Sequence, residues 1–500
     1  MNKKNILTII RISAGFLLLT PLGCSDFLDK PLQGQLTQQN FPTSASDALG
    51  ATNGAYNILR NSNYHFGLFP IMDIMSDDAN KGSNPSDQAA TIGPYNTFTH
   101  IKEELTMAAW WSTLYLGVKT ANVVIEKVPA IQMDDALKTR YIAEASFLRA
   151  LHYFDLARAW GGVPLVTTTV VPPSLARAPI GDVYNLIIGD LQVAIAGLPE
   201  KSEYAAKDAG RATKGAAKAL LAKVYLFLPQ PDFVNAAKYA LEVINSAQYS
   251  LESDFANANG VLGENGVESI FEIGALPFEG QENGGNQYAN VQGVRGYPNR
   301  GWGFNRPSMD LMAAYEAGDP RQDKTIITLG EVIDGVTILG DGSTPDVTKD
   351  ASNNTIEIEC YNQKVWTPGV TVPTQFEHHR RILRYADVLL MAAEALNENG
   401  NGTDARMYLN RVRLRARDGN GTILPDVTET DKNLLRDRIL KERRIELALE
   451  GHRFWDLVRT GKAATSLGPL GFKTGQHELL AIPQTEIDLS HNLLTQNPQW

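Results

Sequence analysis

Cysteine and histidine are scarce in this chain of 500 residues, which contains 2 cysteines and 8 histidines. Two cysteines, at positions 24 and 360, do not make the framework of several disulfides that staples small secreted domains. The histidines are spread along the sequence, and no Cys/His spacing is typical of a zinc site. His378 and His379 are adjacent, but they have no third ligand at a suitable spacing. The fold must therefore rest on packing and polar contacts.

Positive charge is also in deficit. The chain has 46 Lys and Arg against 56 Asp and Glu, which gives a formal net charge of −10 at pH 7. Binding to nucleic acid needs a basic surface that neutralises phosphates, and adsorption to an anionic membrane face has the same requirement. The composition therefore argues against both kinds of partner. The hydrophobic content of 43% is enough to fill a large core.

The apolar stretch near the N-terminus, Ile6–Leu19, is too short and too mixed to span a bilayer. Because two lysines precede it, the segment has the form of a secretion signal. It ends at Cys24, where a small residue directly before a cysteine resembles a bacterial lipobox, although Pro21 stands where leucine is usual. We expect residues 1–23 to be removed and Cys24 to be acylated. The alternative is an ordinary signal peptide followed by a chance cysteine.

Amphipathic helical spacing dominates two long parts of the sequence. In Asp135–Trp160, the residues Phe147, Leu151 and Phe154 recur at i, i+4 and i+7, and two glycines end the pattern. Similar patterns predict helices at 46–59, 110–128, 182–198, 215–228, 233–247, 385–397 and 404–417. Pairs of such helices, rich in Ala and Tyr, favour tetratricopeptide-like hairpins with a period of about 34 residues. Between residues 249 and 385 the pattern lapses into loops and a few short strands. The sequence thus predicts a mainly α protein.

The segment Asp437–Gly461 combines a buried helix with charged side chains. Its apolar residues occupy most of the circumference, which is typical of a helix surrounded by protein. Arg438, Glu442 and Glu446 recur every four residues inside the apolar stripe. Because a charge that faces a core is tolerated only when it is paired, we predict structural ion pairs here. Further candidate members of this network are Arg443, Arg453 and Arg459. An active site is the alternative interpretation, but no nucleophile or metal ligand adjoins the segment.

Residues 442–461, ERRIELALEGHRFWDLVRTG, resemble the C-terminal signature of the SusD/RagB family of Bacteroidetes outer-membrane lipoproteins. Further matches lie at 26–37 (DFLDKPLQGQLT), 143–166, 384–398 and the turn 318–321, so the resemblance covers nearly the whole mature chain. It implies tetratricopeptide-like helical hairpins that support a loop-rich ligand-binding face. It also implies a surface-exposed, lipid-anchored outer-membrane protein that binds oligosaccharide and caps a SusC-like TonB-dependent transporter. Since RagB-like relatives handle peptides, peptide is an alternative ligand class.

The loop 284–307 has the composition best suited to a carbohydrate ligand. Aromatic residues stand among Gly, Asn, Gln and Arg, and the loop contains no Asp, Glu or Lys. Rigid aromatic rings offer flat faces to sugars, polar side chains bond their hydroxyls, and glycine lets the backbone approach a ligand. The alternative is a glycine-rich loop whose aromatic residues only pin it to the helices. The predicted ligand-binding residues in this loop are Tyr288, Tyr297, Arg300, Trp302, Phe304 and Asn305.

A second long region of loops extends from residue 61 to residue 100. Loops of this length in a domain are usually functional. Its predicted ligand-binding residues are Asp73, Asn80, Tyr95 and Asn96. We accordingly divide the chain into a signal peptide (1–23), a SusD-like N-terminal region (24–230) and a RagB/SusD C-terminal region (231–500).

Motifs of catalysis are not evident. The sequence has no Gly-x-Ser-x-Gly and no phosphate-binding loop. The segment Asp341–Asp346 offers oxygen ligands that calcium accepts, but it lacks the spacing of a twelve-residue calcium loop. We therefore expect a binding protein without cofactor. Two alternatives remain open: a glycoside hydrolase, which would need two carboxylates about 5 to 9.5 Å apart, and a purely structural partner of the transporter.

The lipid anchor is testable. Cys24→Ala should release the protein from the membrane fraction, because acyl chains would supply its membrane affinity at about 0.8 kcal/mol for each buried CH₂. Detergent-phase partitioning and incorporation of labelled palmitate measure this. Unchanged partitioning of the variant would contradict the lipobox interpretation. Asp26 and Asp29, which resemble an acidic surface-export signal, can be exchanged for Asn in the same assay and should leave acylation unchanged.

Overall fold

The computed structural model describes residues 41–69, 73–170, 172, 174–277, 284–375 and 377–500. Pro42–Trp500 forms one structural unit. The predicted signal peptide, Cys24 and the acidic residues after it lie outside the described residues. No helix in the described ranges is both long enough and apolar enough to cross a membrane.

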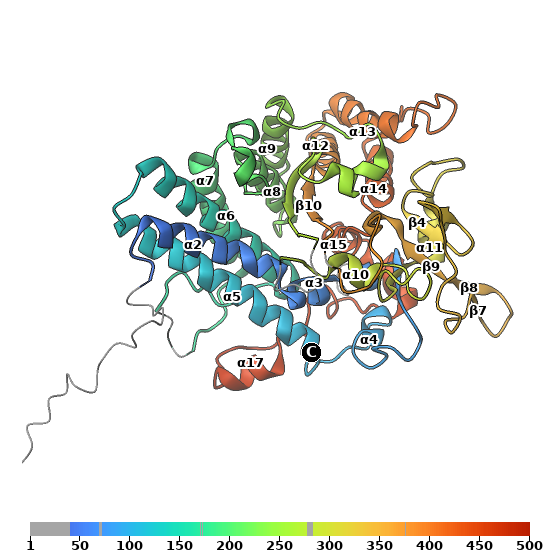
Figure 1. The fold of residues 1–500 in the computed structure, drawn as a ribbon, viewed down its shortest axis with the longest axis horizontal. Helices are drawn as coiled ribbons and strands as arrows, with labels where there is room; N and C mark the ends of the chain where they lie inside the picture. The colour runs from blue at the N-terminus through green and yellow to red at the C-terminus, as the bar shows by residue number, and fades with distance from the viewer. Residues whose placement is uncertain (1–40, 70–72, 171, 173, 278–283, 376) are drawn as a thin grey trace, which may run out of the picture. The chain divides into compact units, whose positions relative to one another are not determined.

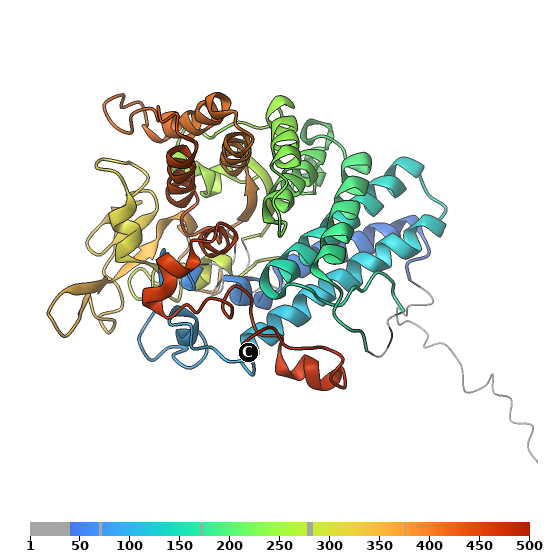
Figure 2. The same ribbon diagram turned by 180° about the vertical axis from the view of Figure 1, so that it is seen from behind.

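The long helices of the unit form an array in which each helix packs on the next. The first five of this array are α5 (Leu105–Lys127), α6 (Asp135–Trp160), α7 (Ile180–Gly197), α8 (Lys214–Phe227) and α9 (Phe233–Asn245). The array continues from α9 to α12 (Tyr385–Glu398), which contacts α13 (Gly402–Ala416) and α14 (Lys432–Glu446). The helix α2 (Ala45–Asn57) packs on α5 and α6 (Figures 1 and 2). The prediction of a mainly α protein with helical hairpins is confirmed.

Local sequence explains where these helices begin, end and approach one another. The helix α6 begins where Asp134 accepts a hydrogen bond from the backbone N–H of Leu137, and it ends at Gly161, whose φ is +75°. Its contact with α5 depends on Gly117, because a Cβ there would lie 2.2 Å from Nε2 of His152. A side chain at this position would push the two helices apart.

Shorter elements lie mainly beyond the array. The short helices are α3 (Ser62–Phe69), α4 (Gly93–Asn96), α10 (Tyr288–Gln292), α11 (Met309–Ala314), α15 (Arg453–Arg459), α16 (Ala463–Leu467) and α17 (Gln484–Leu489). The strands form antiparallel pairs: β1 (Ala79–Gly82) with β3 (Phe304–Pro307), β2 (Ser269–Ile273) with β10 (Arg380–Arg384), β4 (Ile326–Thr328) with β9 (Cys360–Asn362), β5 (Val332–Ile333) with β6 (Val336–Thr337), and β7 (Val347–Lys349) with β8 (Thr355–Ile358). The strands β4, β7, β8 and β9 lie with α11 at the end of the unit away from α2 (Figure 1).

The pair β1–β3 joins the two loop regions that the sequence singled out. Asn80 lies opposite Arg306 in the ladder, and Gly82 lies opposite Phe304. The backbone N–H of Ser83 also donates to the carbonyl of Gly303, at 2.6 Å. The region 61–100 and the loop 284–307 are therefore parts of one structure.

A buried ion-pair network surrounds α14. Glu442 accepts from Arg321 at 2.6 Å and from Arg413 at 2.8 Å. Glu446 pairs with Arg321 at 3.1 Å, with Arg384 at 2.7 Å, and with Arg415. Burial alone would raise the pKa of Glu446, but the guanidinium groups of Arg415, Arg384 and Arg321 hold it below its usual range.

The other predicted members of the network lie elsewhere. Arg438 is 49% exposed and pairs with Glu429, so its placement among the core-facing charges was wrong. Arg443 is buried with Asp387 and Asp456, and Arg459 with Glu394 and Asp456. Arg453 reaches Asp77 at 2.7 Å. These arginines tie α14 and α15 to α12 and to the region around residue 77.

Removal of one buried charge tests this description. Glu446→Gln should lower the free energy of unfolding at pH 7 by about 3 kcal/mol or more, because three arginines lose their shared carboxylate. Since the pKa of Glu446 is depressed by folding, the loss should shrink as the pH falls below about 4, where the unfolded chain also becomes protonated. Urea denaturation at several pH values measures both effects.

The matched control is Asp437→Asn on the same helix. Asp437 is 61% exposed and pairs with Lys462, so its replacement should change stability by less than about 1 kcal/mol. Equal effects of the two substitutions would contradict the distinction between buried and surface pairs.

Candidate functional site

Tyr297 is the most exposed aromatic side chain of the loop 284–307, with 57% of its surface accessible. Its backbone is nevertheless fixed, because its N–H donates to the carbonyl of Gly340 at 2.8 Å and its carbonyl accepts from Leu339 at 2.9 Å. The approach is close: a Cβ at Gly296, whose φ is +84°, would lie 2.1 Å from the carbonyl oxygen of Gly340. The loop thus presents an exposed ring on a firmly held backbone, as preorganised binding requires.

Arg300 brings a second aromatic residue to this loop. Its guanidinium lies 3.8 Å from the ring centroid of Trp366 and donates to the carbonyl of Thr367 at 2.9 Å. The indole N–H of Trp366 donates to Asp334 at 2.6 Å. Trp366 is half-buried, so part of its surface faces solvent. Sequence analysis did not identify Trp366 as a candidate, because no pattern relates it to a loop 66 positions earlier.

Trp302 is half-buried and packs against the main hydrophobic core. Its backbone N–H donates to the carbonyl of Asn290 at 2.7 Å. It therefore combines a packing role with an accessible part. We call Tyr297, Arg300, Trp302 and Trp366 the aromatic loop surface.

The remaining predicted ligand residues of both regions are less accessible than Tyr297. Tyr288, Phe304, Asn305, Asp73 and Tyr95 are buried. The hydroxyl of Tyr95 donates to Glu104 at 2.6 Å, and Asn96 accepts from the backbone N–H of Lys81 at 2.8 Å. Asn80 is half-buried within β1. In this structure the buried side chains contact other parts of the protein instead of solvent, and their role in ligand binding stays a prediction.

The segment suggested for calcium makes other contacts. One carboxylate oxygen of Asp341 accepts from the backbone N–H groups of Ser343 and Thr344, and the other accepts from Arg295 at 2.6 Å. Arg295 also pairs with Asp87, which fixes the loop to the turn after β1. Among the residues that the structure describes, no group of three or more His, Cys, Asp or Glu side chains is arranged to hold a metal ion.

Asp73 joins the loop to the end of the signature segment. Its carboxylate accepts from Nδ2 of Asn305 at 3.0 Å and from the backbone N–H of Gly451 at 3.0 Å. Asn305, with φ +56°, also donates to Gln292 at 2.9 Å. Burial raises the pKa of Asp73 to about 7, against the two hydrogen bonds, which lower it. The nearby Asp78 raises this pKa further, and Arg380 lowers it.

The junction predicts a pH-dependent stability. Because folding raises the pKa of Asp73 from its unfolded value near 4, the folded state binds the extra proton between about pH 4 and pH 7. The contribution of this group to the free energy of unfolding is therefore fully present below about pH 4, and it is lost as the pH rises from there through about 7. Between pH 5 and pH 8, wild type should lose roughly 2 to 3 kcal/mol relative to Asp73→Asn, since each pKa unit corresponds to about 1.4 kcal/mol. A pH-independent difference in urea denaturation would contradict the raised pKa.

Comparison with known proteins gives the family. Residues 267–500 match a family model described as the SusD family, and residues 35–226 match one described as starch-binding associating with outer membrane. The SusD-like protein P2 of Formosa agariphila is 31% identical to this chain, in an alignment that covers 97% of this chain and 98% of the relative. The chain belongs to the SusD family. The starch-binding protein SusD of Bacteroides thetaiotaomicron is 26% identical over 73% of both chains.

Solved structures of SusD-family proteins have the same fold. A laminarin-binding SusD-like protein superposes with a TM-score of 0.75 at 30% identity, covering 92% of this chain and 100% of that chain. Surface glycan-binding protein A from Bacteroides thetaiotaomicron, in complex with laminarihexaose, gives a TM-score of 0.75 at 25% identity, with 91% of this chain and 100% of that chain covered. The resemblance of the signature segment to this family is thus confirmed.

Proposed function

We propose that this SusD-family protein is a non-catalytic carbohydrate-binding protein of the cell surface that captures oligosaccharide at the aromatic loop surface. The single observation that carries this proposal is the exposed Tyr297 on a fixed backbone, in the loop that also carries the Arg300–Trp366 stack. Sugar rings pack their CH faces on aromatic rings, and their hydroxyls accept hydrogen bonds from Arg. A binding site of this kind needs no nucleophile.

The relatives support the ligand class. One similar structure is named for laminarin binding, another holds laminarihexaose, and a more distant relative is a starch-binding protein. These ligands are neutral glucans. A β-glucan of the laminarin type is therefore the first ligand to test, with a starch oligosaccharide as the second.

The proposal extends to the site of action. Acyl chains on Cys24 hold the protein in the outer membrane, and the protein caps a SusC-like TonB-dependent transporter that imports the captured sugar. The lipobox-like end of the N-terminal segment supports the anchor, and family membership supports the partner. Co-purification of the transporter with wild type from detergent-solubilised outer membrane tests this part, and absence of any outer-membrane partner would contradict it.

Substitutions of the two aromatic residues Tyr297 and Trp302 should have different effects on affinity and on stability. Tyr297→Ala should weaken binding of laminarihexaose or maltohexaose by roughly thirty-fold, because loss of an anchoring ring costs about 2 kcal/mol and each 1.4 kcal/mol is tenfold. Its melting temperature should change little, since the ring is mostly exposed. Trp302→Ala should lower both affinity and stability, because its half-buried ring also packs on the core. Calorimetric titration and thermal melts measure the two effects.

The matched control is Tyr239→Ala. Tyr239 stacks on Tyr225 at 5.9 Å on α9, so it tests loss of a half-buried tyrosine away from the loop. Its variant should keep wild-type affinity. Unchanged affinity of both Tyr297→Ala and Trp302→Ala would place the sugar elsewhere, and failure of wild type to bind any oligosaccharide would overturn the proposed function.

A further inference from the structure

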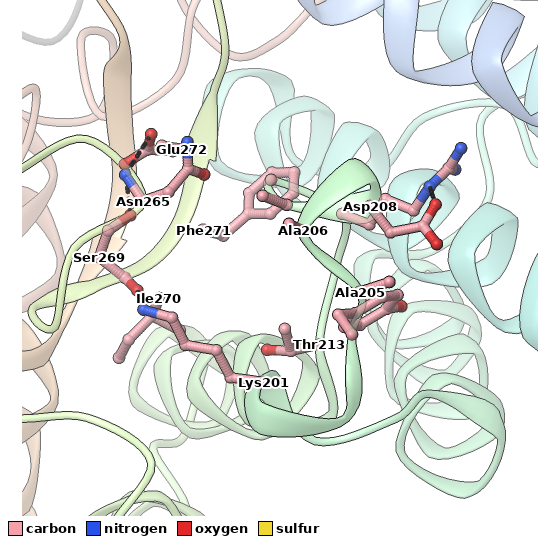
Figure 3. A pocket seen from close by; sticks show the side chains of 14 residues that line it. Lys201, Ala205, Ala206, Asp208, Thr213, Asn265, Ser269, Ile270, Phe271 and Glu272 are labelled. Atoms are coloured by element: carbon pink, nitrogen blue, oxygen red, sulfur yellow. Dashed lines mark hydrogen bonds and ion pairs between the residues drawn. The ribbon is translucent and has the colours of Figure 1, made fainter.

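A cleft of mixed polar and apolar lining lies between two segments that contribute nothing to the aromatic loop surface. One wall is the turn region 201–213 between α7 and α8, and the other is formed by residues 265–272, which include β2. Figure 3 shows the side chains of the two walls facing each other across an open space. The cavity has a volume of about 120 Å³.

A second hollow adjoins this cavity. It has a volume of about 320 Å³, is bounded on its far side by α2, and shares Ala209, Gly210, Arg211 and Glu272 with the cavity. Ligand sites commonly measure about 300 to 1,000 Å³. The two spaces together, which we call the β2 cleft, therefore have the size of a small-ligand site, whereas the cavity alone does not.

The walls are held in place by contacts outside the open space. Arg211 donates to Asp208 and to the buried Glu144, each at 2.8 Å. On the opposite wall, Glu272 accepts from the backbone N–H of Asn265 at 2.9 Å and from Nδ1 of His379 at 2.5 Å. The cleft thus keeps its form without a ligand, so binding would cost little reorganisation.

The charges of the lining select against ions. Lys201 and Arg211 line the cleft together with Asp208 and Glu272. Arg211 pairs with Asp208 and Glu144, and Glu272 pairs with His379 and Arg381, so the lining presents no excess charge of one sign. An anionic ligand would meet the two carboxylates, and a cationic ligand would meet the ammonium and guanidinium groups. A neutral ligand with many hydroxyls meets neither penalty, because hydroxyl groups both donate to carboxylates and accept from cations.

Hydrogen-bonding capacity remains available in the cleft. Lys201 uses two of its three N–H groups on the carbonyls of Gly266 and Ser269. Within the described residues, the side-chain amide of Asn265 makes no hydrogen bond, and the residue is exposed. Ile270 and Phe271, which are neighbours on β2, add apolar lining at two places around the opening. An unpaired amide and a remaining ammonium N–H close to apolar lining suit a pyranose ring, which has both a CH face and a hydroxyl rim.

We propose that the β2 cleft is a second site for neutral oligosaccharide, independent of the aromatic loop surface. The inference rests on the proposed function, since it takes the same ligand class. Two sites on one chain raise the avidity for a polysaccharide that can reach both, without any need for either site to bind tightly.

A large side chain placed in the β2 cleft tests this proposal. Ala209 is exposed and lines both halves, so Ala209→Trp should block the cleft without disturbing the core. Ala130→Trp is the matched control, because Ala130 is likewise exposed at the end of a short 3₁₀ helix and lines neither space. Asn265→Gly is a second variant; it removes the amide and tolerates the φ of +53° at this position.

Hydrogen exchange of the full mature chain in detergent, with and without laminarihexaose or maltohexaose, locates binding by peptide. We expect protection of residues 204–212 and 265–271 as well as of the loop 290–302. Ala209→Trp and Asn265→Gly should abolish the protection of residues 204–212 and 265–271 and keep the protection of the loop 290–302. Calorimetry should show that the affinity of the cleft falls by about tenfold or more. Ala130→Trp should behave as wild type.

The outcomes separate this inference from the proposed function. Protection confined to the loop 290–302 would overturn the second site and leave the proposed function standing. Protection that persists in Ala209→Trp would also overturn it. Protection of the cleft alone would support the second site and contradict binding at the loop, and no protection by any oligosaccharide would overturn both.

Discussion

Carboxylates of the segment 442–450 and the arginines around them decide how the parts of this molecule meet. Glu446 lies among Arg321, Arg384 and Arg415, which come from a turn, from β10 and from α13. In a low-dielectric interior an unpaired guanidinium is costly, so each of these segments is stable only when it reaches the shared carboxylate. Apolar packing alone would tolerate a shift of one helix along another, whereas a bidentate pair such as that of Arg384 with Glu450 tolerates very little.

The same segment reaches the ligand loops. Glu450 pairs with Arg384 at 2.7 Å and with Lys364 at 2.6 Å, and Lys364 precedes Trp366 by two residues. The backbone N–H of Gly451 holds Asp73, which in turn holds Asn305. The loops of the aromatic loop surface are thus fixed to the helical array through a short series of polar contacts. A rigid support of this kind lets irregular loops present side chains at low entropic cost.

Sequence patterns predicted the parts of this structure that depend on local spacing. The helix α6 was placed at its observed bounds, because its apolar period and its end signals lie within the helix itself. Glu442 and Glu446 were recognisable as charges in an apolar stripe, but their partner Arg321 lies more than a hundred residues away, and no spacing relates the turn that contains it to these glutamates. Tyr95 and Tyr297 each stand in a loop region next to Gly, Pro and Asn, yet the first is buried and the second is exposed. Tertiary packing makes that difference. It also explains why Trp366 was not predicted as a site residue and why Arg438 was wrongly predicted to face the core.

The ladder between β1 and β3 has a consequence for how the chain acquires its structure. Its strands are separated by more than two hundred residues, and Asp78, beside β1, pairs with Arg444, 366 positions further on. A contact between residues so far apart in sequence requires a large loop to close. The chain loses conformational entropy on closure before the contact stabilises the fold, so folding is slow. The N-terminal helices can pack locally, while β1 and its acidic neighbours stay unpaired until the later segments fold onto them. The fold can therefore be completed only when the last part of the chain is present. A chain that ends too early would expose an unpaired strand edge and unpaired aspartates to chaperones and proteases.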